Sequence, residues 1–170
     1  MKNTMKRIAP PIAVALAALT VAGCATLVSG GSSADEIATV ASYGLVTPQQ
    51  AAVIIAEQDG SEDLVLLDIR TDGEIEAAHI PGAVSLDFYS PTFRDDLARL
   101  DRELTYLIYC RTGNRTGQTY RVMQDLGFEN VYDMDGGITH WINLGYPVCQ
   151  GSLDAGHTCS GEFPIVVDAG

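Results

Sequence analysis

The stretch Tyr106-Leu-Ile-Tyr-Cys110-Arg-Thr-Gly-Asn-Arg-Thr116 decides how the rest of the chain is interpreted. It begins with an apolar, aromatic run, which is typical of a buried strand. A loop follows that contains one cysteine, one glycine and two arginines: Cys110, Gly113, Arg111 and Arg115. Beyond the loop, apolar residues at near-helical spacing up to Gly127 predict a helix. The stretch therefore predicts a strand, a turn and a helix N-terminus that meet at one cysteine.

Cys110 is a candidate nucleophile because of this setting. The backbone N–H groups of a turn and a helix N-terminus converge on one point, where the helix dipole favours negative charge. We expect the Cys110 thiol to be held there as thiolate, the reactive form. An isolated cysteine is more often a small buried core residue, but Arg111, Gly113 and Arg115 beside it favour the reactive interpretation.

Strand-like and helical segments alternate on both sides of this stretch. Thr47-Pro48-Gln49-Gln50 predicts a helix start with a capping box, and the helix continues over 51–57. The apolar run Leu64–Ile69 predicts a strand buried on both faces, with Asp68 near its end. The remaining expected elements are helices over 74–78, 93–100 and 138–144, and strands over 84–86 and from 131. This alternation indicates an α/β fold with an open, mostly parallel sheet flanked by helices on both faces. Ligands of such sheets bind at the C-terminal ends of the strands.

Length and composition limit the class of protein. A chain of 170 residues with 46% hydrophobic content has room for one domain with a real core. The formal net charge of −12 disfavours nucleic acid and anionic lipid headgroups as partners.

The N-terminus has the pattern of an export signal. Lys2, Lys6 and Arg7 precede an apolar run over 8–22, which ends in small residues before Cys24. Val21-Ala22-Gly23-Cys24 resembles the lipobox of bacterial lipoproteins, which implies cleavage before Cys24 and lipid attachment to its thiol. We therefore expect a periplasmic or other extracytoplasmic protein, anchored to the membrane by lipid. Loss of residues 1–23 removes three basic and no acidic residues, so the formal net charge changes from −12 to −15.

The remaining cysteines divide into a pair and a free thiol. Exported proteins meet an oxidising compartment, in which neighbouring cysteines tend to form disulfides. Cys149 and Cys159 are close in sequence and flank a Gly-rich loop, so we expect them to pair. Cys110 is then the free thiol, in agreement with its motif.

The domain organisation follows from these assignments. The signal peptide covers 1–23, the lipidated cysteine and a flexible tether 24–44, the domain 45–148 and a C-terminal extension 149–170. The glycines of the extension indicate a loop, and the apolar run 163–167 is interpreted as an edge strand or a docked segment. His157 beside Cys159 is interpreted as a solvated loop histidine.

The segment from about residue 45 to 148 resembles a single rhodanese (sulfurtransferase) domain. The resemblance rests on Leu66-Leu67-Asp68-Ile69-Arg70, on Glu76-Ala77-Ala78-His79-Ile80-Pro81-Gly82-Ala83, on Cys110-Arg111-Thr112-Gly113-Asn114-Arg115-Thr116, and on Asp135-Gly136-Gly137 with Trp141, Gly145 and Pro147. Ala78 departs from the family, which usually has glycine there. The family's cysteine phosphatase relatives have the spacing Cys-x5-Arg, in which the arginine position falls on Thr116 of this chain. The shorter loop favours a sulfur atom over a phosphate or arsenate.

The resemblance implies a sulfur transfer in two half-reactions. The Cys110 thiolate takes the outer sulfur of a donor such as thiosulfate and becomes a persulfide, which the N–H groups of residues 111–116 stabilise. A thiol or cyanide then removes that sulfur, so ping-pong kinetics are expected. We expect no cofactor and no metal, and the chain has no Cys/His spacing typical of a zinc site.

The roles of the surrounding side chains are left open by the sequence. Arg111 is expected to point outward and attract an anionic donor. Arg115 is expected either to act on the substrate or to brace the loop by pairing with a carboxylate, and Asp68 is a candidate partner for either Arg115 or Arg70. The resemblance makes His79 a turn-stabilising residue rather than a base.

Two other functions remain as alternatives. In one, Cys149 and Cys159 are redox-active and resolve the Cys110 persulfide by disulfide exchange. In the other, the chain is a binding or sulfur-sensing module that uses this fold without catalysis. The donor, the acceptor and the oligomeric state are left open.

Overall fold

A computed structural model of the chain describes residues 43–58, 61–154 and 156–163. The expected signal peptide, Cys24 and nearly all of the tether lie outside these residues, as does the run 164–167. Among the helices of the described ranges, none is long and apolar enough to cross a membrane.

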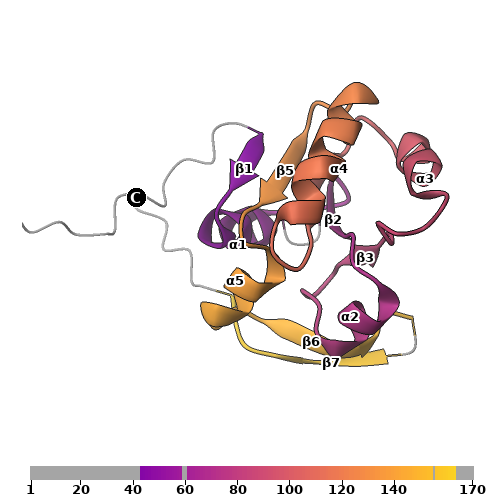
Figure 1. Cartoon of the computed structure of the whole chain (residues 1–170). Coiled ribbons are helices and arrows are strands. Elements are labelled where there is room, and N and C mark those ends of the chain that lie inside the picture. The colour runs from indigo at the N-terminus through magenta and orange to yellow at the C-terminus, as the bar shows by residue number, and fades with distance from the viewer. Residues whose placement is uncertain (1–42, 59–60, 155, 164–170) are drawn as a thin grey trace, which may run out of the picture. The chain divides into compact units, whose positions relative to one another are not determined.

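The core of the domain is a five-stranded sheet in which every described strand pair is parallel (Figure 1). The spatial order is β1-β5-β4-β2-β3. The strands are β1 (Gly44–Val46), β2 (Leu64–Asp68), β3 (Val84–Ser85), β4 (Thr105–Tyr109) and β5 (Val131–Met134). β1 is not predicted from the sequence, because three residues are too few to show a strand pattern.

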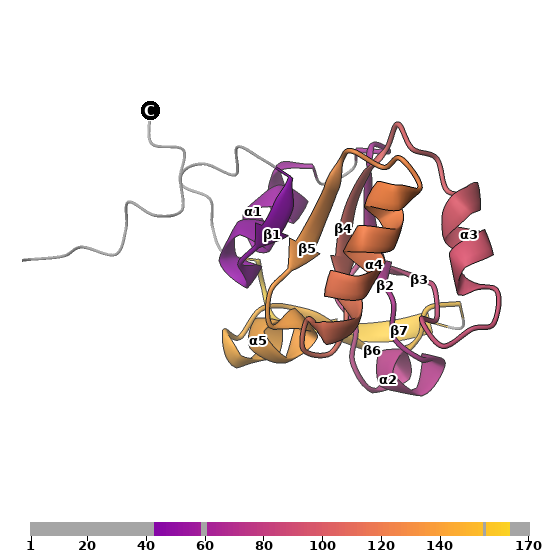
Figure 2. The same ribbon diagram turned by 45° about the horizontal axis from the view of Figure 1, so that its top comes forward.

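Helices cover both faces of this sheet, as Figure 2 shows. On one face lie α1 (Pro48–Glu57) and α5 (Gly137–Asn143), and on the other lie α3 (Phe93–Arg99) and α4 (Asn114–Asp125). Successive residues of β4 alternate between the two cores, since Leu107 packs on the α1/α5 face and Ile108 on the α3/α4 face. The expected α/β class, with a parallel sheet between two helical layers, is confirmed.

Two helices begin with capping boxes. At α1, the Gln50 N–H donates to Thr47 Oγ1 at 3.2 Å and the Thr47 N–H donates to Gln50 Oε1 at 2.9 Å, as the sequence predicts. A second box, of Thr71 and Glu74, starts α2 (Asp72–Ala77). The predicted start at Glu74 is therefore wrong by two residues, because Glu74 belongs to the first turn of α2.

The segment after the sheet domain is a hairpin, so the prediction of a loop is wrong. β6 (Val148–Ser152) and β7 (Gly156–Ser160) pair antiparallel, with Cys149 opposite Cys159. A disulfide joins these two cysteines. The glycines that indicated a loop lie at the hairpin's ends and turn, where Gly151 and Gly156 adopt positive φ.

Candidate active site

Cys110 lies directly after β4, at the C-terminal edge of the parallel sheet. Because its side chain follows the alternation of β4, it points to the α3/α4 face, where it is 1% exposed. It is the free cysteine of the described ranges. The sequence prediction of a strand, a turn and a helix N-terminus around Cys110 matches this arrangement.

The loop between β4 and α4 folds around the sulfur. Gly113 adopts φ 91°, a conformation that favours glycine, and its N–H donates to Cys110 Sγ at 3.2 Å. The Thr116 hydroxyl lies 4.0 Å from Sγ and donates to the Gly113 carbonyl at 2.8 Å. α4 begins at Asn114, directly after Gly113, so the N-terminus of α4 faces the Cys110 thiol.

The N-terminus of α5 holds the back of this loop. The Ile138 N–H donates to the Cys110 carbonyl at 2.9 Å, and the Thr139 N–H donates to the Arg111 carbonyl at 3.1 Å. Gly137 makes this approach possible, because a Cβ there would lie 2.3 Å from the Cys110 carbonyl oxygen. Asp135-Gly136-Gly137, which the sequence gives only as part of the family resemblance, therefore fixes the backbone of the cysteine loop.

Arg115 pairs with Glu74, a residue that the sequence did not indicate. The guanidinium donates to both Glu74 carboxylate oxygens, at 2.8 and 2.7 Å, and lies over the Tyr89 ring. The hydrogen bonds from Arg115 lower the pKa of Glu74 to about 2. The same pair raises the pKa of Arg115. Arg115 is thus a brace between α4 and α2, joined by a bidentate charge-assisted contact.

Asp68 binds Arg70 rather than Arg115. Both side chains are buried, and the Arg70 Nε donates to Asp68 Oδ1 at 2.8 Å. Arg70 also donates to the backbone carbonyls of Glu74 and Ala78, at 3.2 and 2.7 Å. Arg70 therefore fixes the C-terminal part of α2 against the sheet, which in turn positions Glu74 for Arg115.

His79 holds a turn on the other side of the sheet. Its ring is fully buried, and Nδ1 donates to the Ile75 carbonyl at 3.0 Å. The next residue, Ile80, belongs to the core of the α1/α5 face, whereas Cys110 belongs to the core of the α3/α4 face. The placement is that of a structural residue.

Asp133 is a buried acid beneath the cysteine loop that sequence reasoning missed. It is 7% exposed on β5, and its Oδ2 faces Gly117 in the first turns of α4. Burial raises its pKa, partly offset by the Thr116 hydroxyl. The one available signal was a carboxylate within the otherwise apolar run of β5.

The remaining loop side chains face solvent. Arg111, Thr112 and Asn114 are exposed, in line with the expectation that Arg111 points outward.

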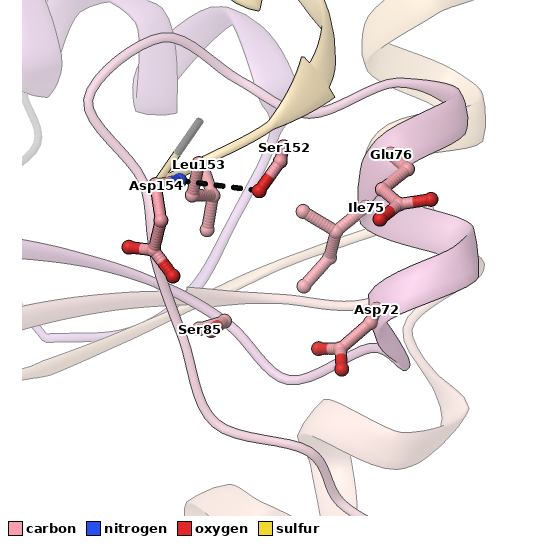
Figure 3. Close-up of a pocket in the computed structure, with 7 residues that line it drawn as sticks. All are labelled: Asp72, Ile75, Glu76, Ser85, Ser152, Leu153 and Asp154. Atoms are coloured by element: carbon pink, nitrogen blue, oxygen red, sulfur yellow. Dashed lines mark hydrogen bonds between the residues drawn. The ribbon is translucent and has the colours of Figure 1, made fainter. Parts of the chain in front are cut away.

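A pocket away from Cys110 lies between α2 and the turn of the hairpin (Figure 3). It is lined by Asp72, Ile75, Glu76, Ser85, Ser152, Leu153 and Asp154. No residue of the cysteine loop lines it.

These features, a parallel α/β sheet and a cysteine loop closed by a helix N-terminus, coincide with a known family. The chain belongs to the rhodanese-like domain family, whose model matches residues 50–144. This confirms the family resemblance found in the sequence.

Relatives with related names each match more than half of the chain. The thiosulfate sulfurtransferase GlpE of Pseudomonas entomophila is 32% identical over 111 residues, covering 64% of this chain and 94% of the relative. A sulfurtransferase of Allochromatium vinosum is 33% identical over 88 residues, covering 52% and 80%. The probable adenylyltransferase/sulfurtransferase MoeZ of Mycobacterium tuberculosis is 29% identical over 65% of this chain, which spans 28% of that relative's length.

Solved structures agree with the fold. The BH2092 protein of Bacillus halodurans has a TM-score of 0.54 at 26% identity, over 66% of this chain and 79% of that one. A rhodanese-related protein of Thermoplasma volcanium has a TM-score of 0.51 at 27% identity, over 62% and 97%.

Proposed function

We propose that this chain is a sulfurtransferase in which Cys110 accepts a sulfane sulfur and passes it to a thiophilic acceptor. The observation that carries the proposal is the free Cys110 thiol with the Gly113 N–H directed at its sulfur, in front of the α4 N-terminus. The names of the relatives, which include sulfurtransferases and a thiosulfate sulfurtransferase, support it.

The first half-reaction loads the cysteine. The Cys110 thiolate attacks the outer sulfur of thiosulfate, a bond forms between the two sulfurs, and sulfite leaves with the electron pair of the broken S–S bond. Cys110 becomes a persulfide whose terminal sulfur carries the negative charge. In the second half-reaction, cyanide or a thiolate attacks that terminal sulfur, and the Cys110 thiolate leaves. The charge balances in both steps, which together form a ping-pong cycle.

The loop supplies the electrostatic part of this chemistry. Backbone N–H groups from Arg111 to Thr116 are the donors that stabilise the terminal sulfur, aided by the dipole of α4. They need no reorganisation, because α5 already fixes the loop through the carbonyls of Cys110 and Arg111.

The loop also favours sulfur over phosphate. Thr116 stands where a Cys-x5-Arg loop places its arginine, and its hydroxyl donates within the loop to Gly113. Arg115 is occupied by both oxygens of Glu74, so its donors are turned toward α2. A tetrahedral oxyanion would lack the bidentate arginine that phosphate recognition favours.

The proposed place of action is the extracytoplasmic surface of a membrane. Its support is the sequence pattern before Cys24, with a basic start, an apolar run and a lipobox-like end. The intact mass of the expressed protein tests it. The wild type should lack residues 1–23 and carry lipid on Cys24, whereas Cys24→Ser should carry no lipid; a wild type without added lipid mass would contradict lipid attachment at Cys24.

Thiocyanate formation from thiosulfate and cyanide tests the catalytic proposal. The wild type should give parallel double-reciprocal lines, and Cys110→Ser should fall to background while keeping the wild-type thermal unfolding midpoint. Turnover by Cys110→Ser would contradict the mechanism. A wild type inactive with thiosulfate and with other sulfane donors would favour the non-catalytic binding module instead.

A further inference from the structure

A compact group of nitrogen and sulfur atoms lies where the C-terminal hairpin meets the turn after α2. The ligand atoms of His79, Cys149 and His157 all lie within 4.8 Å of one another. The two imidazole rings contact edge to face, with centroids 5.1 Å apart. Cys159 adds a second sulfur at the same place, because it is bonded to Cys149. None of these residues has a part in the chemistry proposed for Cys110.

One ring nitrogen of His79, a member of this group, keeps a free lone pair. Its Nδ1 lies 3.0 Å from the Ile75 carbonyl, which only accepts, so the ring proton is on Nδ1. Nε2 is then an acceptor, and it is buried with no hydrogen-bond partner among the described residues. Buried polar atoms are seldom left without a partner. A histidine whose other nitrogen donates to a carbonyl has the orientation that metal-binding histidines show.

The hairpin combines a rigid half and an adjustable half. The backbones of His79 and Cys149 exchange two hydrogen bonds, at 2.8 and 2.7 Å, and both residues are fully buried. His157 and Cys159 lie opposite on β7, where every residue is exposed. The backbones of the first two residues are therefore fixed, whereas the side chains of His157 and, after reduction, Cys159 are free to adjust toward a common centre.

We propose that reduction of the Cys149–Cys159 disulfide opens a binding site for Zn²⁺ formed by two thiolates and two imidazoles. The ligands are Cys149, Cys159, His79 and His157. Tetrahedral sets of two sulfurs and two nitrogens are typical of zinc. Bond lengths of about 2.0–2.3 Å place such ligand atoms roughly 3.3–3.8 Å apart. Reduction frees the Cys149 side chain to rotate, and this rotation, with shifts of His157 and Cys159 on exposed β7, closes the 4.8 Å group to this spacing.

Disulfide and metal exclude each other in this site. A dithiol reductant gives two electrons and two protons to the disulfide and itself becomes a disulfide. Zn²⁺ then displaces the two thiol protons as it binds the sulfurs. The oxidised hairpin offers only the two imidazoles, so its affinity for the metal is far lower. This assigns His157 a role other than that of a solvated loop residue.

Cobalt(II) substitution in the full chain tests the site, with Cys24→Ser/Cys110→Ser as the background so that the hairpin holds the remaining thiols. After reduction and removal of the reductant, one Co²⁺ per chain should give the strong visible bands of a tetrahedral site and a thiolate charge-transfer band in the near ultraviolet. Zn²⁺ should abolish both. Without reduction, neither band should appear. Identical spectra for reduced and oxidised protein would overturn the proposal.

His140, the one histidine outside the proposed site, supplies a matched control. His157→Gln should weaken Co²⁺ binding to the reduced protein by at least about 100-fold, since loss of an indirect partner alone costs 10–100-fold. His140→Gln, a change at an exposed histidine on α5, should leave the affinity unaltered. Both substituted positions are exposed, so neither variant should unfold the domain. Equal affinities of the two variants would exclude His157 as a ligand and contradict the four-ligand site.

Discussion

At the scale of single residues, Arg115 and Arg111 have different surroundings although both follow Cys110 within five residues. Arg115 is tied to Glu74 through two hydrogen bonds, whereas Arg111 is exposed. The sequence left pairing with a carboxylate as one of two roles for Arg115 and gave no way to find Glu74, which precedes Arg115 by 41 residues. Only the fold brings α2 and the start of α4 close enough for the two side chains to meet.

Glu74→Gln should lower stability in a pH-dependent way. The folded-state pKa of Glu74 is lowered from 4.5 to about 2, so its carboxylate stabilises the fold fully above pH 4.5 and progressively less as pH falls toward 2. We expect the variant to lose about 1 kcal/mol at neutral pH, as for a partly exposed pair. Urea unfolding at both ends of this pH range measures it. Glu76→Gln, an exposed site on the same helix, is the control; a wild-type advantage that persists unchanged near pH 2 would contradict the assignment.

Arg111→Gln should weaken the use of an anionic donor. One positive charge about 6 Å from the two negative charges of thiosulfate is worth roughly 1.4 kcal/mol in water, or about tenfold in KM at low salt. Steady-state kinetics with varied thiosulfate measure the effect, which should shrink with added salt. Arg121→Gln, an exposed site on α4, should leave KM unchanged. If the two variants behave alike, Arg111 does not attract the donor.

At the scale of elements, α5 holds the cysteine loop in place. Gly136 and Gly137 both adopt positive φ, which lets the α5 N–H groups reach the carbonyls of Cys110 and Arg111. A Gly-Gly pair in a sequence indicates a tight turn. Its contact with the active-site backbone depends on β4 and β5 being neighbours in the sheet, which the turn residues do not reveal.

Gly137→Ala should disrupt the loop. Its Cβ would lie 2.3 Å from the Cys110 carbonyl oxygen, so the backbone must move, and φ is 55°. We expect the free energy of unfolding to fall by about 3 kcal/mol or more, and we expect sulfur transfer to be lost as well. Gly145→Ala separates clash from strain, because Gly145 also has positive φ, 77°, but has open space around it. Gly145→Ala should lose about 1 kcal/mol and keep activity. Thermal unfolding and turnover of both variants measure these effects. Equal losses of stability and activity in the two variants would show that the close approach of Gly137 to the Cys110 carbonyl is unimportant.

The hairpin disulfide should stabilise the fold without serving catalysis. It closes a loop with a sequence separation of 10, for which restriction of the unfolded chain gives about 2–3 kcal/mol. Cys149→Ala/Cys159→Ala should lose this amount and retain sulfur transfer, since Cys110 is unchanged. Unfolding in the presence of a chelator, compared with oxidised wild type, provides the check. Loss of transfer to a dithiol acceptor in the double variant would favour the redox-active role instead.

At the scale of the whole molecule, the alternation of apolar runs and helical patterns was enough to predict the parallel α/β sheet. Long, regular signals such as the Thr47 capping box and the Leu64–Ile69 run correspond to α1 and β2. The failures fall on short or glycine-rich segments. β1 has three residues, and the hairpin's cross-strand pairing overrides the loop tendency of its glycines.

The candidate site likewise has one part that the sequence predicts and another that it does not. Cys110 and its loop are contiguous in sequence, so a local pattern was sufficient to find them. The supporting groups come from distant segments, with Glu74 on α2, Asp133 on β5 and Gly137 on α5. Their convergence follows from strand order, because β4 lies between β5 and β2. A sequence without its fold does not specify that order.

The intact mass of the protein before and after thiosulfate tests the central claim most directly. We predict that the wild type gains the mass of one sulfur atom, that cyanide removes it, and that Cys110→Ser never acquires it. Peptide mapping should place the added sulfur on Cys110. No gain in mass by a wild type whose Cys110 is free and alkylatable, or an equal gain by Cys110→Ser, would contradict the persulfide mechanism.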